Sequence, residues 1–364
     1  MTIISIVPRL PPAIDGVGDY ALRLAQQLYQ DYGLSTHFIV GDPDWSGQID
    51  LPGISAVKVS EQSADCLFTL LTAHSQTSTI ILLHFSGYGY AQRACCFWLV
   101  EGLERWKRST SKARLVTMFH EIYNSFGMPW KHNFWVSPIQ RVLAARLIRC
   151  SDCYLTNTEL HAEMLHGLSH DRTQQIPTLP VFSTMGEAQD LLPLSERKKQ
   201  LVIFGQTASR MRAYRESLPV IGHICQSLEI EQILDIGQPT GMQLRAVGEI
   251  PLIEMGKRSS GEISQILQTS IAGFINYDPT RLAKSTIFAA YCAHRLLPVS
   301  ASQSVSDRDH ITAGKHYWVP SASSNSTELQ TIADDAHLWY QAHNLSAQAT
   351  CFATTLTAVQ EVTQ

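Results

Sequence analysis

Strand-length apolar runs alternate with helical patterns along most of this chain, and this alternation limits the possible folds more than any other feature. The apolar runs of the first half lie at 3–8, 35–41, 78–85, 113–120 and 152–157. Apolar residues at helical spacing lie between them, at 20–29, 91–106 and 136–149. Because buried strands that alternate with helices form parallel sheets covered on both faces, we expect an α/β fold.

The alternation stops between residues 176 and 200, where prolines, small residues and charged residues follow one another, and then it restarts. The apolar runs of the second half lie at 201–205, 231–237, 271–277 and 296–302. We therefore predict two Rossmann-like domains that face a cleft. The predicted boundaries are 1–183 for the N-terminal domain, 184–200 for the linker, 201–345 for the C-terminal domain and 346–364 for a final helix. That helix is expected to pack as an outer layer, with the N-terminal domain as one surface for it.

Composition and charge exclude several classes of protein. The 364 residues suffice for two domains, and 45% hydrophobic with 16% charged residues is typical of globular proteins. A formal net charge of -4 gives no electrostatic basis for binding nucleic acid. No apolar run approaches the about 20 residues of a membrane span, and the first residues lack a basic region before a long apolar stretch. We predict a cytoplasmic protein with no nucleic-acid partner.

Residues 16–21, Gly-Val-Gly-Asp-Tyr-Ala, fit the G-x-G-x-x-A fingerprint of dinucleotide-binding folds. In such folds the first glycine directly follows the first strand, whereas residues 8–15, with three prolines, intervene here. This context disfavours an NAD-dependent oxidoreductase. Two glycines ahead of a helix still let the backbone approach a ligand, and free amides there attract a phosphate or sugar oxygen. Gly16 and Gly18 are therefore candidate donor-binding residues, and Asp19 fits either the helix cap or a functional carboxylate.

Five segments resemble, in order, motifs of the GT-B-fold retaining glycosyltransferases, the group that includes glycogen synthase and bacterial mannosyltransferases. They are 11–28, 116–130, 151–165, 201–214 and 287–302. The resemblance implies transfer of a sugar, hexose-like, from a nucleotide-sugar to a glycan, lipid-linked or small-molecule acceptor, with retention and a role in polysaccharide biosynthesis. The nucleotide-sugar would be a substrate, and we predict no cofactor and no metal.

The same resemblance implies catalytic residues at the end of the apolar run 113–120. His120 follows this run, where ligands of open α/β sheets bind, and a histidine of the resembled family contacts the reacting sugar at this point. Glu121 fits a base or a group that orients a sugar hydroxyl. The alternative is that His120 is hydrogen-bonded within a loop and that Glu121 is an exposed carboxylate, neither with a catalytic role.

The donor-binding half departs from the family pattern. The nearest equivalents of the family's basic pair are Arg210 and Arg212, while Gln206 replaces the basic residue after the glycine. Because residues two apart on a helix do not share a face, we expect Arg210 to be the one that reaches a ligand. The two glutamates that hold the donor sugar in many members are absent. Lys284, Ser285 and Thr286 instead stand at a predicted helix start, a combination that suits an anion. Asp278 is a candidate replacement for a lost carboxylate. These departures keep an alternative open: a GT-B-like glycan-binding or scaffold protein with impaired catalysis.

Two segments are candidates for acceptor recognition. The loop 84–93 carries Tyr88, Tyr90 and Arg93 among glycines, which suits stacking on a sugar. The helical pattern 130–149 carries two tryptophans and three arginines, and it fits a peripheral contact with an anionic membrane at the inner face. An ordinary packed helix with solvated arginines fits the same pattern.

Overall fold

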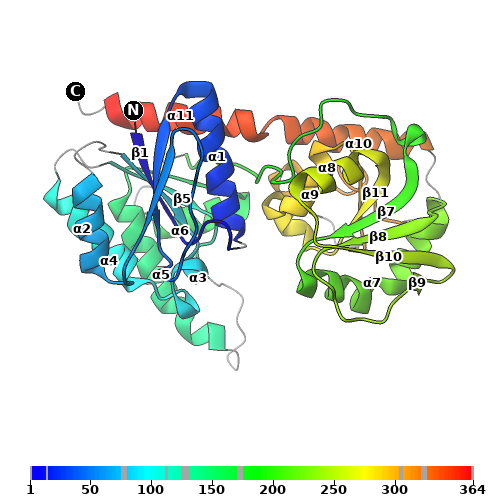
Figure 1. Cartoon of the computed structure of the whole chain (residues 1–364), viewed down its shortest axis with the longest axis horizontal. Coiled ribbons are helices and arrows are strands. Elements are labelled where there is room, and N and C mark those ends of the chain that lie inside the picture. The colour runs from blue at the N-terminus through cyan, green and yellow to red at the C-terminus, as the bar shows by residue number, and fades with distance from the viewer. Residues whose placement is uncertain are drawn as a thin grey trace. The chain divides into compact units, whose positions relative to one another are not determined.

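The computed structural model describes residues 2–13, 15–74, 80–110, 114–123, 132–169, 175–302, 306–320 and 326–361. The chain forms two compact units: residues 1–179 together with 345–364 make unit 1, and residues 180–344 make unit 2. Unit 2 begins before the predicted linker 184–200, which contains a 3₁₀ helix, η2 (Leu194–Glu196), and the first residues of strand β7. The last described helix, α11 (Leu345–Glu361), belongs to unit 1 (Figure 1).

Unit 1 contains a six-stranded, wholly parallel sheet. Its strands are β1 (Thr2–Val7), β2 (Ser35–Val40), β3 (Ile54–Lys58), β4 (Ile80–Phe85), β5 (Arg114–Phe119) and β6 (Cys153–Thr156). They are arranged in the order β3-β2-β1-β4-β5-β6, with parallel pairing throughout. This is the strand order of the Rossmann fold, in which the order reverses between the first strand and the fourth.

Helices cover both faces of this sheet because alternate strand residues point to opposite sides. The helices are α1 (Gly16–Tyr32), α2 (Ala64–His74), α3 (Gly87–Tyr90), η1 (Gln92–Ala94), α4 (Phe97–Ser109), α5 (His132–Cys150), α6 (Glu159–Leu168) and α11. α2, α4 and α5 pack in the core on one face, whereas α1, with α11 against it, packs on the other (Figure 1).

Unit 2 repeats this architecture with a second six-stranded sheet. Its strands are β7 (Lys198–Phe204), β8 (Gln232–Ile236), β9 (Ala246–Val247), β10 (Ile250–Gly256), β11 (Ser270–Ile275) and β12 (Leu297–Ser300). The order is β12-β11-β7-β8-β10-β9, and only the short β9 runs antiparallel to its neighbour. The strand order therefore reverses between β7 and β11. The helices are α7 (Thr207–Ser227), α8 (Ser260–Thr269), η3 (Pro279–Lys284), α9 (Thr286–Ala293), η4 (Arg308–His310) and α10 (Ser326–Gln341).

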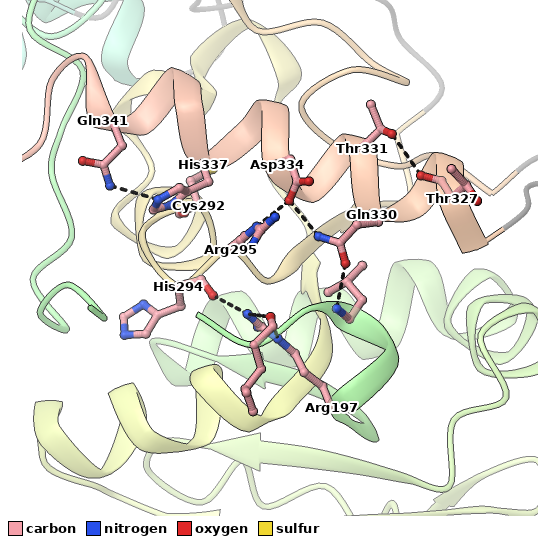
Figure 2. A network of polar contacts seen from close by, with 12 residues as sticks. Arg197, Cys292, His294, Arg295, Thr327, Gln330, Thr331, Asp334, His337 and Gln341 are labelled. Atoms are coloured by element: carbon pink, nitrogen blue, oxygen red, sulfur yellow. Dashed lines mark hydrogen bonds and ion pairs between the residues drawn. The ribbon is translucent and has the colours of Figure 1, made fainter. Parts of the chain in front are cut away.

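A buried arginine fastens the helices of unit 2 to the segment that leads into β7 (Figure 2). Arg197 donates to the carbonyl oxygens of Leu192 at 2.8 and 3.0 Å and of His294 at 3.0 Å. It also donates to the carbonyl oxygens of Leu267 at 3.3 Å and Ser270 at 3.4 Å. Burial lowers the pKa of Arg197 to about 10. One side chain thus joins the end of α8, the start of β11 and the end of α9.

Helix α10 is attached beside this arginine by side-chain contacts. Arg295, at the end of α9, pairs with Asp334 of α10, and Gln330 donates to the same carboxylate at 2.7 Å. Gln330 in turn accepts from the backbone N–H of Leu194 at 2.7 Å (Figure 2). These contacts tie α10, α9 and the segment before β7 into one polar network.

The two sheets and their covering helices confirm the α/β fold of two Rossmann-like units. The apolar patterns miss β3, α2 and the β9–β10 pair. β3 and β10 are largely half-buried or exposed, so their sequences lack the continuous apolar run that marks the central strands.

Candidate functional site

In each unit, the carboxyl ends of the strands where the order reverses are the expected place for a ligand. In unit 1 these are β1 and β4, with β5 adjacent to β4. The loop 8–15 follows β1, α3 follows β4, and His120 with Glu121 follows β5. The backbone N–H of His120 donates to the carbonyl oxygen of Phe85 at 2.9 Å, so the ends of β4 and β5 are held together. The sheet topology therefore gathers the unit 1 candidates at one edge.

The start of α1 differs from the expectation of free amides. Asp15 is the N-cap, and its carboxylate accepts from the N–H groups of Val17 at 3.0 Å and Gly18 at 2.8 Å. The helix is thus capped by Asp15 and not by Asp19. A Cβ on Gly18 would lie 2.0 Å from the carbonyl oxygen of Arg9, whereas a Cβ on Gly16 would have open space. Gly18 therefore lets the proline-rich loop fold back onto the helix.

Asp19 lies in the first turn of α1, four residues after the Asp15 cap. Burial, followed by the negative charge of Asp15, raises the pKa of Asp19 to about 6, and Arg23 opposes this shift. A carboxyl group with a pKa in this range can both hold and release a proton near neutral pH. Asp19 is therefore a second acid or base candidate at this edge.

His120 directly follows β5 at the carboxyl edge of the unit 1 sheet and is buried, with 4% of its surface exposed. Its Nε2 lies 3.1 Å from Nδ1 of His84, and the Tyr20 ring makes a T-shaped contact with its imidazole, with centroids 4.9 Å apart. Glu121 accepts a hydrogen bond from Oγ of Ser86 at 3.0 Å. His120 and Glu121 therefore occupy the predicted edge, within a network of polar and aromatic contacts.

The glycine and tyrosine loop separates into accessible and buried parts. Tyr88 is 45% exposed and Arg93 is exposed, and the carbonyl oxygen of Arg93 accepts from Gln140 at 2.9 Å. Tyr90 is fully buried, and its hydroxyl lies 2.9 Å from the carbonyl oxygen of His84 and 3.0 Å from that of Ile6. Tyr90 thus joins β1 to β4 in the core, while Tyr88 and Arg93 are accessible to solvent.

In unit 2 the loop after β7 approaches the start of α9. Gly205 has a φ of 130°, which other residues rarely adopt, and a Cβ there would lie 2.8 Å from the side chain of Ile287. The N-cap of α7, Gln206, is exposed and makes no side-chain cap hydrogen bond. The starts of α7 and α9 are thereby brought together at the carboxyl edge of this sheet.

The two candidate arginines of α7 have different environments. Arg210 is only 1% exposed, forms a buried ion pair with Asp235 and donates to the carbonyl oxygens of Gly205 and Gln238. The hydroxyl of Tyr214 donates to the other oxygen of Asp235 at 2.5 Å. Burial raises the pKa of Asp235, while Tyr214 and Arg210 stabilise its ionised form. Arg210 is therefore positioned to support the loops after β7 and β8 and offers no surface to a ligand.

Arg212 is exposed at the edge itself. It donates to the carbonyl oxygen of Asn276, directly after β11, at 2.9 Å and lies 3.8 Å from a carboxylate oxygen of Glu216. The sequence argument favoured Arg210 over Arg212 as the residue that reaches a ligand. The accessibility of the two side chains favours Arg212.

The residues before α9 act as caps. Ser285 caps α9 and accepts from the N–H of Phe288 at 3.2 Å, so it is buried at the helix start. Asp278 caps η3 and accepts from the N–H and hydroxyl of Thr280 at 3.0 and 2.8 Å. Lys284 and Thr286 are half-buried on either side of Ser285. Lys284, Ser285 and Thr286 therefore surround a helix start, as the sequence suggested.

The membrane-contact hypothesis concerns α5. Trp130 lies outside the described residues. Arg146 pairs with Glu104 at 2.8 Å, and the guanidinium of Arg141 lies 5.4 Å from the centroid of the Tyr123 ring. Within the part of the chain that the structure describes, the helices are too short or too polar to cross a membrane. Peripheral contact stays a prediction.

Sequence reasoning missed Tyr20 and His84, which contact His120, and Gln348, which accepts a hydrogen bond from Tyr20. His84 interrupts the apolar strand "IILLHF", and a titratable residue within a buried strand is a signal that could have identified it. Tyr20 lies within the glycine fingerprint. Gln348 gives no such signal, because only the packing of α11 against α1 brings it to Tyr20.

No family model and no curated protein sequence matches this chain. Solved structures do match it over nearly its whole length. The trehalose-6-phosphate protein from E. coli bound with UDP-2-fluoro glucose is 11% identical with a TM-score of 0.61, covering 98% of this chain and 99% of that one. The pneumococcal O-GlcNAc transferase GtfA in complex with UDP and GlcNAc is 11% identical with a TM-score of 0.59, covering 99% of both chains. The UDP-GlcNAc 2-epimerase from Methanocaldococcus jannaschii is 10% identical with a TM-score of 0.53, covering 98% and 99%. At such identities the likeness establishes the shared GT-B fold.

Proposed function

We propose that this protein is a glycosyltransferase that moves a sugar from a nucleotide-sugar to a glycan, lipid-linked or small-molecule acceptor, with retention. The observation that carries this proposal is the match of both units, over nearly the whole chain, to proteins solved with UDP or a UDP-sugar. The resemblance of five ordered sequence segments supports it independently. A protein that has one Rossmann-like unit for each of two substrates has the architecture that such a transfer needs.

The donor diphosphate binds, in this proposal, at the edge of unit 2 where α7 and α9 begin. Two helix starts direct N–H groups and the positive ends of their dipoles at an anion. Arg212 and Lys284 add positive charge, and Thr286 adds a hydroxyl beside the Ser285 cap. The role of Arg210 is to hold the loop after β7 in place.

The transfer itself breaks the bond between the sugar and the diphosphate and forms a bond to an acceptor oxygen. The transition state has positive charge on the sugar ring and growing negative charge on the departing diphosphate, so stabilisation of both charges is the main requirement. We assign His120 to contact with the reacting sugar and Glu121 to orientation of a sugar hydroxyl. Tyr88 and Arg93, both exposed, are the proposed acceptor contacts. The reaction as proposed uses no metal.

The direct test is turnover of a panel of nucleotide-sugars with and without acceptor sugars, followed by release of the nucleoside diphosphate. We expect one donor to be consumed, and His120→Ala to lower turnover about 100-fold or more. The melting temperature of that variant separates loss of chemistry from loss of folding. Full activity of a folded His120→Ala variant would contradict its assignment.

Two other outcomes of this assay have distinct meanings. Tight nucleotide-sugar binding without turnover on any acceptor would favour the scaffold alternative that the missing glutamate pair suggests. Conversion of the donor sugar without release of nucleoside diphosphate would indicate epimerisation, the reaction named for the neighbour from Methanocaldococcus jannaschii. Either result would contradict the proposed transfer.

A further inference from the structure

Two buried histidines form a hydrogen-bonded pair behind the carboxyl edge of unit 1. His84 belongs to β4 and His120 follows the adjacent β5. Nδ1 of His84 lies 3.1 Å from Nε2 of His120, and the two rings stack with centroids 5.4 Å apart and planes 23° from parallel. The exposed fractions of the two side chains are 1% and 4%. At this distance one nitrogen carries the proton and the other accepts it.

The environment of His84 keeps its imidazole neutral. Burial lowers the pKa of His84 to about 3, so it does not become charged near neutral pH. A neutral imidazole carries a single N–H, so the two tautomers are coupled: when Nδ1 of His84 donates, Nε2 of His120 accepts, and when Nδ1 of His84 accepts, Nε2 of His120 carries the proton. His84 engages Nε2 of His120.

A tyrosine and a glutamine from two other elements fix the geometry of this pair. The Tyr20 ring, from α1, makes T-shaped contacts with both imidazoles, with centroids 5.9 Å from His84 and 4.9 Å from His120. The Tyr20 hydroxyl donates to Oε1 of Gln348, which is fully buried on α11. The aromatic contacts prevent the rings from sliding, and the hydrogen bond prevents Tyr20 from rotating away.

We propose that His84 is a positioning residue for His120, holding it in one tautomer and one orientation with the help of Tyr20 and Gln348. The inference rests on the proposed function, because it assigns His120 to the reacting sugar. It deepens that function in two ways. The side chain that is assigned to the sugar is prepared before substrate binds, and the C-terminal helix α11 contributes to that preparation. A fixed tautomer matters because a catalytic histidine in the wrong tautomer loses most of its effect.

The first test measures the tautomer and needs no substrate. Full-length protein labelled with ¹⁵N-histidine is compared with two polar variants, His84→Asn and His84→Gln, with His120→Gln used to assign the His120 signals. The asparagine amide can replace Nδ1 of His84, whereas the longer glutamine amide reaches the position of Nε2. We expect a single His120 tautomer in the wild type and in His84→Asn, and averaged signals in His84→Gln. Averaged signals in the wild type, or unchanged signals in His84→Gln, would overturn the proposal.

The second test separates kcat from KM on the nucleotide-sugar that the wild type consumes. We expect His84→Gln to lower kcat about 10-fold or more, with the donor KM within about 2-fold, and His84→Asn to keep kcat within about 3-fold. Equal losses in both variants, in step with their melting temperatures, would mean a purely structural role. If the wild type consumes no nucleotide-sugar, the proposed function fails, while the tautomer measurement still decides whether His84 positions His120.

Discussion

Gly16 and Gly18 belong to one sequence fingerprint but have different surroundings. A Cβ at position 18 would meet the carbonyl oxygen of Arg9 at 2.0 Å, whereas nothing lies within 4 Å of a Cβ at position 16. We therefore expect Gly18→Ala to lower the free energy of unfolding by about 1–3 kcal/mol or more, because the loop must move away from the helix. Gly16→Ala is the matched control, with a change within about 0.5 kcal/mol. Chemical denaturation of both variants measures the difference, and equal stabilities would contradict the close approach.

Asp19 provides a pH-dependent prediction. The native state raises the pKa of this carboxyl group from 3.8 to about 6, so it binds the proton more tightly than the unfolded chain does. Ionisation of Asp19 therefore costs stability progressively as the pH rises from about 4 to about 6, and the cost persists at higher pH. We expect Asp19→Asn to raise the melting temperature relative to the wild type at pH 8 and to leave it nearly unchanged below pH 4. The same difference at both pH values would contradict this environment.

Single residues also show what the sequence can and cannot reveal. The position of His120 follows from the strand pattern, since a residue directly after an apolar run must emerge at the carboxyl edge. Tyr88 and Tyr90 are indistinguishable in the sequence, and only the packed structure shows one exposed and the other buried. In the same way, the sequence does not show that Arg210 is buried and Arg212 exposed, because Asp235, the buried partner of Arg210, lies on a distant element, β8.

At the scale of elements, the central strands were predictable because both of their faces are buried. β4 and β11 are buried along their whole length, which gives continuous apolar runs. β10 is half-exposed, and its alternating pattern is weak. The division of the C-terminal helices between the units depends on long-range packing. The sequence shows two amphipathic helices there, but it cannot show that α10 belongs to unit 2 and α11 to unit 1.

Arg197 connects several elements of unit 2, so its removal should destabilise the fold. Its guanidinium serves the carbonyl oxygens that end α8 and α9, so Arg197→Met would leave several buried acceptors without a donor. We expect a loss of about 3 kcal/mol or more in the free energy of unfolding. Arg258→Met is the control, because Arg258 forms a solvent-exposed pair with Glu262 at 3.2 Å, whose loss should change the stability little. Urea denaturation that gives similar losses for both variants would contradict the role of Arg197 as a clamp.

At the scale of the whole molecule, the sequence alternation and the strand topology lead to the same fold. Each half has the apolar pattern of a Rossmann-like unit, and each sheet reverses its strand order next to its first strand. The chemistry is less readable from the sequence than the fold. The proposed donor edge of unit 2 depends on the approach of the β7–α7 loop to α9, two segments about 80 residues apart along the chain.

The most direct test of the proposed function is calorimetric titration of the whole protein with UDP, GDP, ADP, dTDP and NADH, in magnesium and then in EDTA. We expect one nucleoside diphosphate to bind equally well in both buffers. Lys284→Ala and Arg212→Ala should each weaken this binding about 10-fold, since each removes a charge beside the diphosphate. Arg215→Ala, which removes an exposed charge from the same helix as Arg212, should leave it unchanged. Absence of binding to every nucleoside diphosphate at millimolar concentration, or binding of NADH alone, would contradict a nucleotide-sugar-dependent transferase.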